Sequence, residues 1–146
     1  MAYIKGLNHL CFSVSDLDAS IAFYRDILEG RLLAVGRKLA YFDCQGLWVA
    51  LNQEDVDRSN RDVTYTHIAF SIDEGDYDAV MQKLLDYGVT VMEGRERAQE
   101  DKRSIYFLDP DRHCFEFHTG SLEDRLQYYR SSKPHIQFFD EAERLD

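Results

Sequence analysis

The segments "NHLCFSV" (8–14) and "THIAFSI" (66–72) follow one pattern, and their histidines stand 67 − 9 = 58 residues apart. Apolar and polar side chains alternate in both segments, which is typical of a strand with one buried face. An acidic turn and an amphipathic helix follow each strand. The helical positions are Leu17, Ile21, Tyr24 and Leu28 before Gly30 in the first half, and Tyr77, Val80, Met81 and Leu84 before Gly88 in the second. This repeat predicts two modules of the same design.

Short strand-like segments come after each helix. "KLAYFDCQGLWVALN" (38–52) holds two strands around a Gln-Gly turn, and "RSIYFLDPDRHCFEFH" (103–118) holds two around Asp-Pro-Asp. With these segments, we interpret each half as β-α-β-β-β. This order predicts an α+β fold built from paired βαβββ modules.

The module boundary is expected at the charged run "QEDVDRSNRD" (53–62). The first module then covers residues 1–62 and the second covers 63–130, within one structural domain. A short helix at 121–129, with Ser121 as its N-cap, ends the second module. Residues 131–146 form a C-terminal tail.

Three polar side chains interrupt the strands on the face opposite the expected core. His9 and His67 occupy the same point of the repeat, and Glu116 stands between two phenylalanines. A lone strand histidine is usually structural, but a carboxylate buried without a partner costs several kcal/mol. Two imidazoles and one carboxylate suit a divalent metal with open coordination positions. We therefore predict that His9, His67 and Glu116 are metal ligands.

Composition excludes several classes of partner. The net charge of −10 disfavours nucleic acid and anionic membranes. The sequence shows no signal peptide and no apolar run long enough to span a membrane. Its cysteines are Cys11, Cys44 and Cys114, which form neither a disulfide framework nor a CxxC metal pattern. We expect a cytoplasmic protein with reduced thiols.

The repeat, the ligand set and several longer blocks resemble the vicinal oxygen chelate superfamily and, more narrowly, the FosB-type fosfomycin thiol transferases. The blocks are "LNHLCFSVSDLDASIAFYRDIL", "GRKLAYFDCQGLWVALN", "YTHIAFSI", "EGRERAQEDKRSIYFLDPDRHCFEFHTGSLEDRLQYY" and "KPHIQFF". The resemblance implies the vicinal oxygen chelate fold, in which the paired modules form a cup-shaped mixed sheet, and a homodimer with two cup-shaped sites. It also implies Mn²⁺ or Mg²⁺ as cofactor, and antibiotic resistance through opening of the fosfomycin epoxide by a low-molecular-weight thiol. It also implies that one histidine of each site comes from the partner subunit.

The same resemblance assigns residues to the substrate. Arginines would bind the phosphonate, a tyrosine hydroxyl would support them, and an amide and aromatic rings would line the cavity. These residues are Arg95, Arg125, Tyr106, Asn52, Trp48, Tyr65 and Tyr41. Cys11 shares the face of His9 and is the candidate for a direct catalytic part; its alternative is a small buried filler.

Other functions within the superfamily stay open. Hydrolase relatives carry an added glutamate before the "GLW" block, where this chain has no carboxylate until Asp43, so thiols, with bacillithiol or cysteine foremost, are favoured over water. An isomerase needs a second carboxylate where the repeat places Ala50. Drug-sequestering proteins lack the metal ligands. The chain departs from the family at Arg112, where glycine is usual, and in the 53–62 run.

Overall fold

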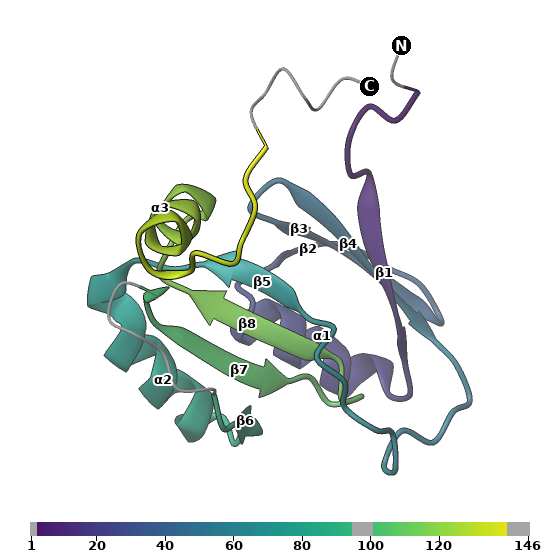
Figure 1. Ribbon diagram of the computed structural model, residues 1–146. Coiled ribbons are helices and arrows are strands. Elements are labelled where there is room, and N and C mark those ends of the chain that lie inside the picture. The colour runs from purple at the N-terminus through teal and green to yellow at the C-terminus, as the bar shows by residue number, and fades with distance from the viewer. Residues whose placement is uncertain (1–2, 95–100, 140–146) are drawn as a thin grey trace.

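The computed structural model describes residues 3–94 and 101–139. Its first module forms a four-stranded sheet in the order β1-β4-β3-β2, with one helix (Figure 1). Strand β1 pairs parallel to β4, and the other neighbours are antiparallel. The elements are β1 (His9–Val14), α1 (Leu17–Asp26), β2 (Arg31–Val35), β3 (Leu39–Cys44) and β4 (Leu47–Gln53).

The second module repeats this topology in a sheet of its own, with the order β5-β8-β7-β6 and with β5 parallel to β8. A one-turn helix precedes its main helix, and a third α-helix follows the sheet. The elements are β5 (Ile68–Ser71), η1 (Glu74–Asp76), α2 (Tyr77–Asp86), β6 (Val91–Met92), β7 (Ser104–Leu108), β8 (Cys114–His118) and α3 (Leu122–Ser132). The α+β class and the paired modules are confirmed; the boundaries at 62 and 130 stay predictions.

Local chemistry explains where these elements begin and turn. The Asp16 side chain accepts the Ala19 amide at 3.0 Å and caps α1. Between β3 and β4, Gln45 and Gly46 both have positive φ, 54° and 88°, as a two-residue hairpin of this type requires. Ser121 and Asp124 form a capping box at α3. This helix begins where the sequence predicts and runs on to Ser132.

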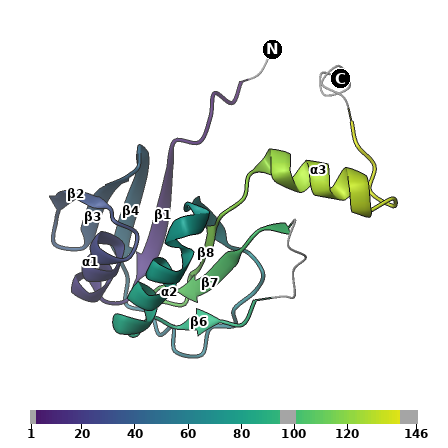
Figure 2. The same cartoon turned by 90° about the vertical axis from the view of Figure 1, so that its left-hand side faces the viewer.

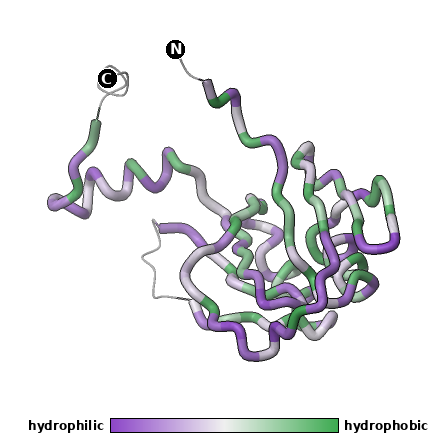
Figure 3. The backbone as a smooth tube through the Cα atoms, turned by 90° about the vertical axis from the view of Figure 1, so that its right-hand side faces the viewer, coloured by the Kyte–Doolittle hydropathy of each residue, from purple (hydrophilic) through white to green (hydrophobic). Residues whose placement is uncertain are grey.

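The core lies between the two sheets. Helix α1 packs against β3 and β4, and its Phe23 and Tyr24 also reach the second sheet, where both rings contact Phe115. Figure 3 shows hydrophobic stretches along the strands that enclose this layer. Phe42 and Phe107 are fully buried in the same cluster. The apolar sides of both modules are thus turned toward each other, and the polar sides are turned outward.

A buried polar network ties the modules together at the turn between β7 and β8. The Tyr24 hydroxyl donates to Asp109 at 2.9 Å, and His113 Nδ1 lies 2.8 Å from the same carboxylate oxygen. Asp111 accepts the backbone N–H of Ser15. Each buried carboxylate therefore has hydrogen-bond donors, as burial demands. The network joins α1 and the end of β1 to the second module.

Arg112 lies in the turn between β7 and β8, at the position where the family pattern has glycine. Its φ is +64°, in the region that favours glycine. Its side chain is not free, however, because Nε donates to the carbonyl of Arg61 at 2.9 Å. The chain departs from the family pattern at Arg112 and in the 53–62 run. The hydrogen bond from Arg112 to Arg61 joins these two places. Within the described ranges, no helix is long and apolar enough to cross a bilayer.

Candidate active site

The outward face of the first sheet carries five of the predicted site residues. His9 and Trp48 are paired on β1 and β4, and their rings lie 4.4 Å apart. Tyr41 lies beside Trp48, with 5.3 Å between ring centroids. The Asn52 amide lies 3.6 Å from the exposed Cys11 sulfur. The strand alternation predicted from the sequence therefore gathers these five side chains on one face.

The second sheet carries the other group. Nε2 of His67 lies 2.8 Å from Oε2 of Glu116, whose side chain is 7% exposed. The Tyr106 ring stands edge-on to His67 at 5.3 Å, and the Tyr65 hydroxyl lies 3.5 Å from that of Tyr106. Tyr106 pairs with Glu116 across β7 and β8. A histidine, a carboxylate and two phenols thus share one face.

The two predicted histidine ligands are oriented alike. Nδ1 of His67 lies 2.6 Å from the carbonyl oxygen of Tyr65, and Nδ1 of His9 lies 2.6 Å from the side-chain oxygen of Asn8. An oxygen acceptor at Nδ1 places the proton there and leaves the lone pair on Nε2. Metal-binding histidines commonly make this contact through their second nitrogen. The orientation therefore fits a ligand role for both.

The contact between His67 and Glu116 also fits a cation. A nitrogen lone pair and a carboxylate oxygen both accept hydrogen bonds, so at 2.8 Å they need a proton or a cation between them. Nitrogen and carboxylate donors suit divalent ions such as Mn²⁺. The donor set on this face is therefore chemically suited to the group that the sequence predicts.

The three predicted ligands do not meet within one copy of the chain. His9 lies on the first sheet against Trp48, whereas Glu116 lies on the second sheet and His67 immediately precedes its strand β5. Among residues 3–94 and 101–139, no three histidine, cysteine or acidic side chains form a group able to hold a metal. A single copy thus holds two of the predicted ligands at one place and the third at another.

The predicted phosphonate arginines are only partly described. Arg125, on α3, forms an ion pair with Asp101, whose side chain is 3% exposed. Helix α3 extends beyond the end of β8, outside the two sheets (Figure 2). Arg95 lies outside the described residues. Sequence reasoning missed Asp101 as the partner of Arg125, because nothing in the local pattern links residues so far apart in the chain.

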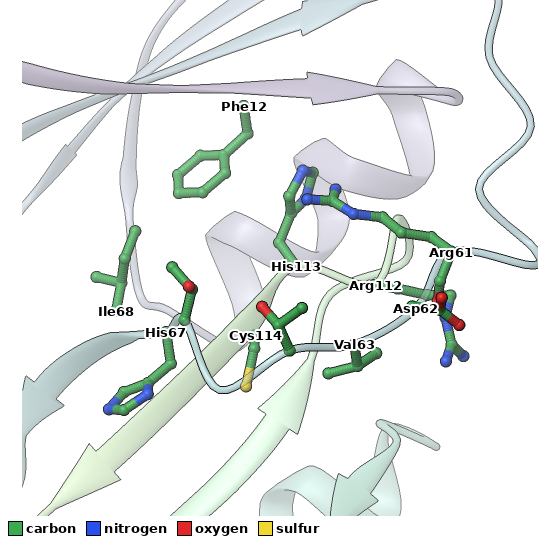
Figure 4. Close-up of a pocket in the computed structure, with 11 residues that line it drawn as sticks. Phe12, Arg61, Asp62, Val63, His67, Ile68, Arg112, His113 and Cys114 are labelled. Atoms are coloured by element: carbon green, nitrogen blue, oxygen red, sulfur yellow. The ribbon is translucent and has the colours of Figure 1, made fainter.

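A small pocket of about 130 Å³ lies near His67 but on another side (Figure 4). It lies between Phe12, the 61–68 segment and the 112–114 turn, and the His67 ring points away from it. None of the described residues predicted to bind substrate lines it. The outward face, not this pocket, is therefore the candidate site.

Comparison with known proteins identifies the family of this chain. The glyoxalase/bleomycin resistance protein/dioxygenase superfamily matches residues 6–117. Metallothiol transferase FosB of Lysinibacillus sphaericus is 51% identical over 94% of this chain and 98% of its own length. FosB of Staphylococcus epidermidis (strain ATCC 12228 / FDA PCI 1200) is 52% identical over the same shares. The chain belongs to the FosB family of metallothiol transferases. It is therefore an enzyme, and the family expected from the sequence is confirmed.

The chain also superposes on solved structures of the fosfomycin resistance protein FosX. A mutant of the fosfomycin resistance protein FosX from Listeria monocytogenes superposes with a TM-score of 0.79 at 38% identity, over 86% of this chain and 98% of FosX. That structure contains Mn(II) and 1S,2S-dihydroxypropylphosphonic acid. The FosX protein from Mesorhizobium loti superposes with a TM-score of 0.72 at 35% identity, over 84% and 98% of the two chains. The vicinal oxygen chelate fold is thus confirmed.

Proposed function

We propose that this enzyme opens the epoxide of fosfomycin with a low-molecular-weight thiol, bacillithiol or cysteine, and so confers resistance to the antibiotic. The observation that carries the proposal is the His67–Glu116 pair on an outward face beside Tyr106. FosB relatives are named metallothiol transferases, and the FosX structures are of fosfomycin resistance proteins. The family and the chemistry of the face support the same substrate.

The proposed cofactor is Mn²⁺ or Mg²⁺, held by His9, His67 and Glu116. When bound, such an ion supplies a Lewis acid that polarises the epoxide oxygen. Two neutral imidazoles and one carboxylate neutralise only one of its two charges. The Mn(II) in the structure of the related FosX supports the choice of ion.

The remaining side chains would bind and orient the two substrates. A phosphonate is an anion, and guanidinium groups bind such oxygens through charge-assisted hydrogen bonds. We assign this part to Arg95 and Arg125, with the Tyr106 hydroxyl as a further donor. Because Arg125 is paired with Asp101, the phosphonate has to compete with that carboxylate.

The face of the first sheet would form the opposite wall. Trp48 and Tyr41 present ring surface, and the Asn52 amide stands beside Cys11. We assign Tyr65, 69% exposed and next to Tyr106, to the rim. The nucleophile is the thiolate of the small-molecule substrate, so the reaction requires no protein nucleophile. A direct part for Cys11 stays a prediction.

A thiol fits this chain better than water as the attacking species. Hydrolysis needs a general base, and Asp43 is the first carboxylate on the strand that faces the site. Its Oδ1 accepts the Gly46 amide at 2.7 Å and its Oδ2 accepts Arg31 at 2.9 Å. The Gly46 hydrogen bond, followed by Arg31, lowers the pKa of Asp43 below 3.8. A carboxylate whose two oxygens already accept hydrogen bonds and whose pKa is lowered is a poor general base.

The proposal includes a homodimer. One copy holds His67 and Glu116 together and His9 apart from them, so a complete ligand set requires His9 of one copy to meet the pair of another. An interface of this kind is isologous and forms two equal sites. The proposal also places the enzyme in the cytoplasm, where low-molecular-weight thiols stay reduced.

One experiment separates the candidate reactions. The Mn²⁺-loaded protein is incubated with fosfomycin and with bacillithiol, cysteine, glutathione or no thiol, and the products are identified by mass spectrometry. The proposal predicts an adduct with bacillithiol or cysteine. A diol formed without thiol would indicate a hydrolase instead, and unchanged, tightly bound fosfomycin would indicate a sequestering protein.

A further inference from the structure

The two carboxylate oxygens of Glu116 face different groups. Oε2 lies 2.8 Å from His67 Nε2, whereas Oε1 accepts a hydrogen bond from the hydroxyl of Ser104. Nδ1 of His118 lies 3.5 Å from Oε1 and 2.8 Å from the Ser104 hydroxyl. Neither Ser104 nor His118 has a part in the proposed reaction so far. Ser104 nevertheless lies within hydrogen-bond reach of both the Glu116 carboxylate and the His118 ring.

The sheet register explains why these groups meet. Ser104 pairs with His118 across β7 and β8, and Tyr106 pairs with Glu116. Ser104 is therefore the diagonal neighbour of Glu116 on the same face of the sheet. Diagonal cross-strand neighbours are close enough for polar side chains to interact. The arrangement follows from the backbone pairing and does not depend on a flexible loop.

The chemistry of the three groups fixes the direction of the hydrogen bonds. A hydroxyl has one proton, and an ionised carboxylate has none to donate. Ser104 donates its proton to Glu116, so it must accept the one on Nδ1 of His118. The chain therefore runs from His118 through Ser104 to Glu116, and linked hydrogen bonds of this kind strengthen one another.

The imidazole of His118 is held from its other side by Gly120. A Cβ atom added at Gly120 would lie 2.8 Å from Nε2 of His118 and 2.7 Å from Cγ of Lys102. Both contacts are too short, so a side chain at residue 120 would displace the His118 ring or the Lys102 side chain. The His118 side chain is 17% exposed. Its position is thus set by packing as well as by the serine hydroxyl.

We propose that Ser104 and His118 are positioning residues for the metal ligand Glu116. They hold Oε1, so that the carboxylate binds a divalent ion through Oε2 alone, beside Nε2 of His67. This inference rests on the metal site of the proposed function. Groups that orient a metal ligand typically change metal affinity or activity by about 10- to 100-fold when they are removed.

The test measures Mn²⁺ binding without substrate, by electron paramagnetic resonance of the free ion. Ser104→Ala removes the donor and is expected to raise the Mn²⁺ dissociation constant by about 10- to 100-fold. Ser104→Thr keeps the hydroxyl and is the matched control, with affinity close to that of the wild type. Thermal unfolding of each variant shows that the fold is retained.

A second pair of variants tests His118 independently. Asparagine places an amide N–H near the position of Nδ1, and glutamine places it near Nε2. His118→Asn is therefore expected to bind Mn²⁺ more tightly than His118→Gln. Wild-type affinity in both Ser104→Ala and His118→Gln would overturn the positioning role while leaving the metal site intact. A wild-type protein that binds no Mn²⁺ would overturn the metal site itself, and this inference with it.

Discussion

Nε2 of His67 and Oε2 of Glu116 lie 2.8 Å apart, although they stand 116 − 67 = 49 residues apart in the sequence, with His67 immediately before β5 and Glu116 on β8. The parallel pairing of β5 and β8 brings them to one face. Tyr65 holds Nδ1 of the histidine, and Ser104 holds Oε1 of the glutamate. Both predicted ligands therefore present one defined atom each, as groups that orient metal ligands commonly ensure.

Replacing His67 by alanine removes one of these two atoms. We expect His67→Ala to lose tight Mn²⁺ binding and thiol transfer together, because Glu116 alone on this face cannot hold the ion. Equilibrium dialysis with Mn²⁺ measures this directly. The exposed His135 provides the control, since His135→Ala should bind as the wild type does. One Mn²⁺ retained per subunit in His67→Ala would contradict the site.

Burial raises the pKa of the Cys44 thiol from 9.0 to about 11. The unfolded chain releases this proton at lower pH than the folded chain does. The contribution of the buried Cys44 thiol to the free energy of unfolding is therefore complete below pH 9 and is lost as the pH rises from 9 to 11. Urea unfolding across this range should show a smaller loss for Cys44→Ala than for the wild type. Identical pH profiles would contradict the shift.

The Tyr24 hydroxyl is buried and donates to Asp109 at 2.9 Å. Tyr24→Phe leaves a buried carboxylate with one donor fewer, so the free energy of unfolding should fall by about 1–3 kcal/mol. Chemical denaturation measures the change. Tyr3→Phe, at a residue 90% exposed, is the control and should have no effect. A stability equal to that of the wild type would show that the network does not tie the modules together.

Arg112 separates backbone strain from a side-chain contact. Arg112→Ala keeps the φ of +64° and loses the bond to Arg61, so we expect it to be less stable by about 0.5–1.5 kcal/mol. Arg112→Gly loses the same bond and removes the strain, and should therefore be more stable than the alanine variant by about 1 kcal/mol. Thermal unfolding compares the two. Equal stabilities would argue against strain at this turn.

Much of each module could be predicted from local patterns. The alternation in "NHLCFSV" placed Phe12 and Val14 in the core and His9 and Cys11 outside, as the structure has them. The Gln45-Gly46 turn and the Ser121 cap were also predictable, because their residue types fit few other conformations. The η1 turn before α2 and the extension of α3 to Ser132 were not, since helix ends depend on contacts beyond the local sequence.

The site was predicted less completely than the strands. Strand alternation alone predicts that His9, His67 and Glu116 each lie on the polar face of a strand. Which of these faces come together depends on how the modules pack. The contact of Ser104 with Glu116 depends on the register between β7 and β8, which no single strand specifies. The partner of Arg125 depends on how α3 lies against residue 101. Long-range packing, not local pattern, decides these points.

The most direct measurement concerns the ligand set shared between two copies. Chains carrying His9→Ala and Glu116→Ala are co-expressed with different tags, and the mixed dimer is isolated and titrated with Mn²⁺. One of its two sites then combines His9 of the Glu116→Ala chain with His67 and Glu116 of the His9→Ala chain. All three of these residues are wild type. The account predicts one tightly bound Mn²⁺ per mixed dimer and none in either parent dimer. A mixed dimer that binds no Mn²⁺ would contradict it.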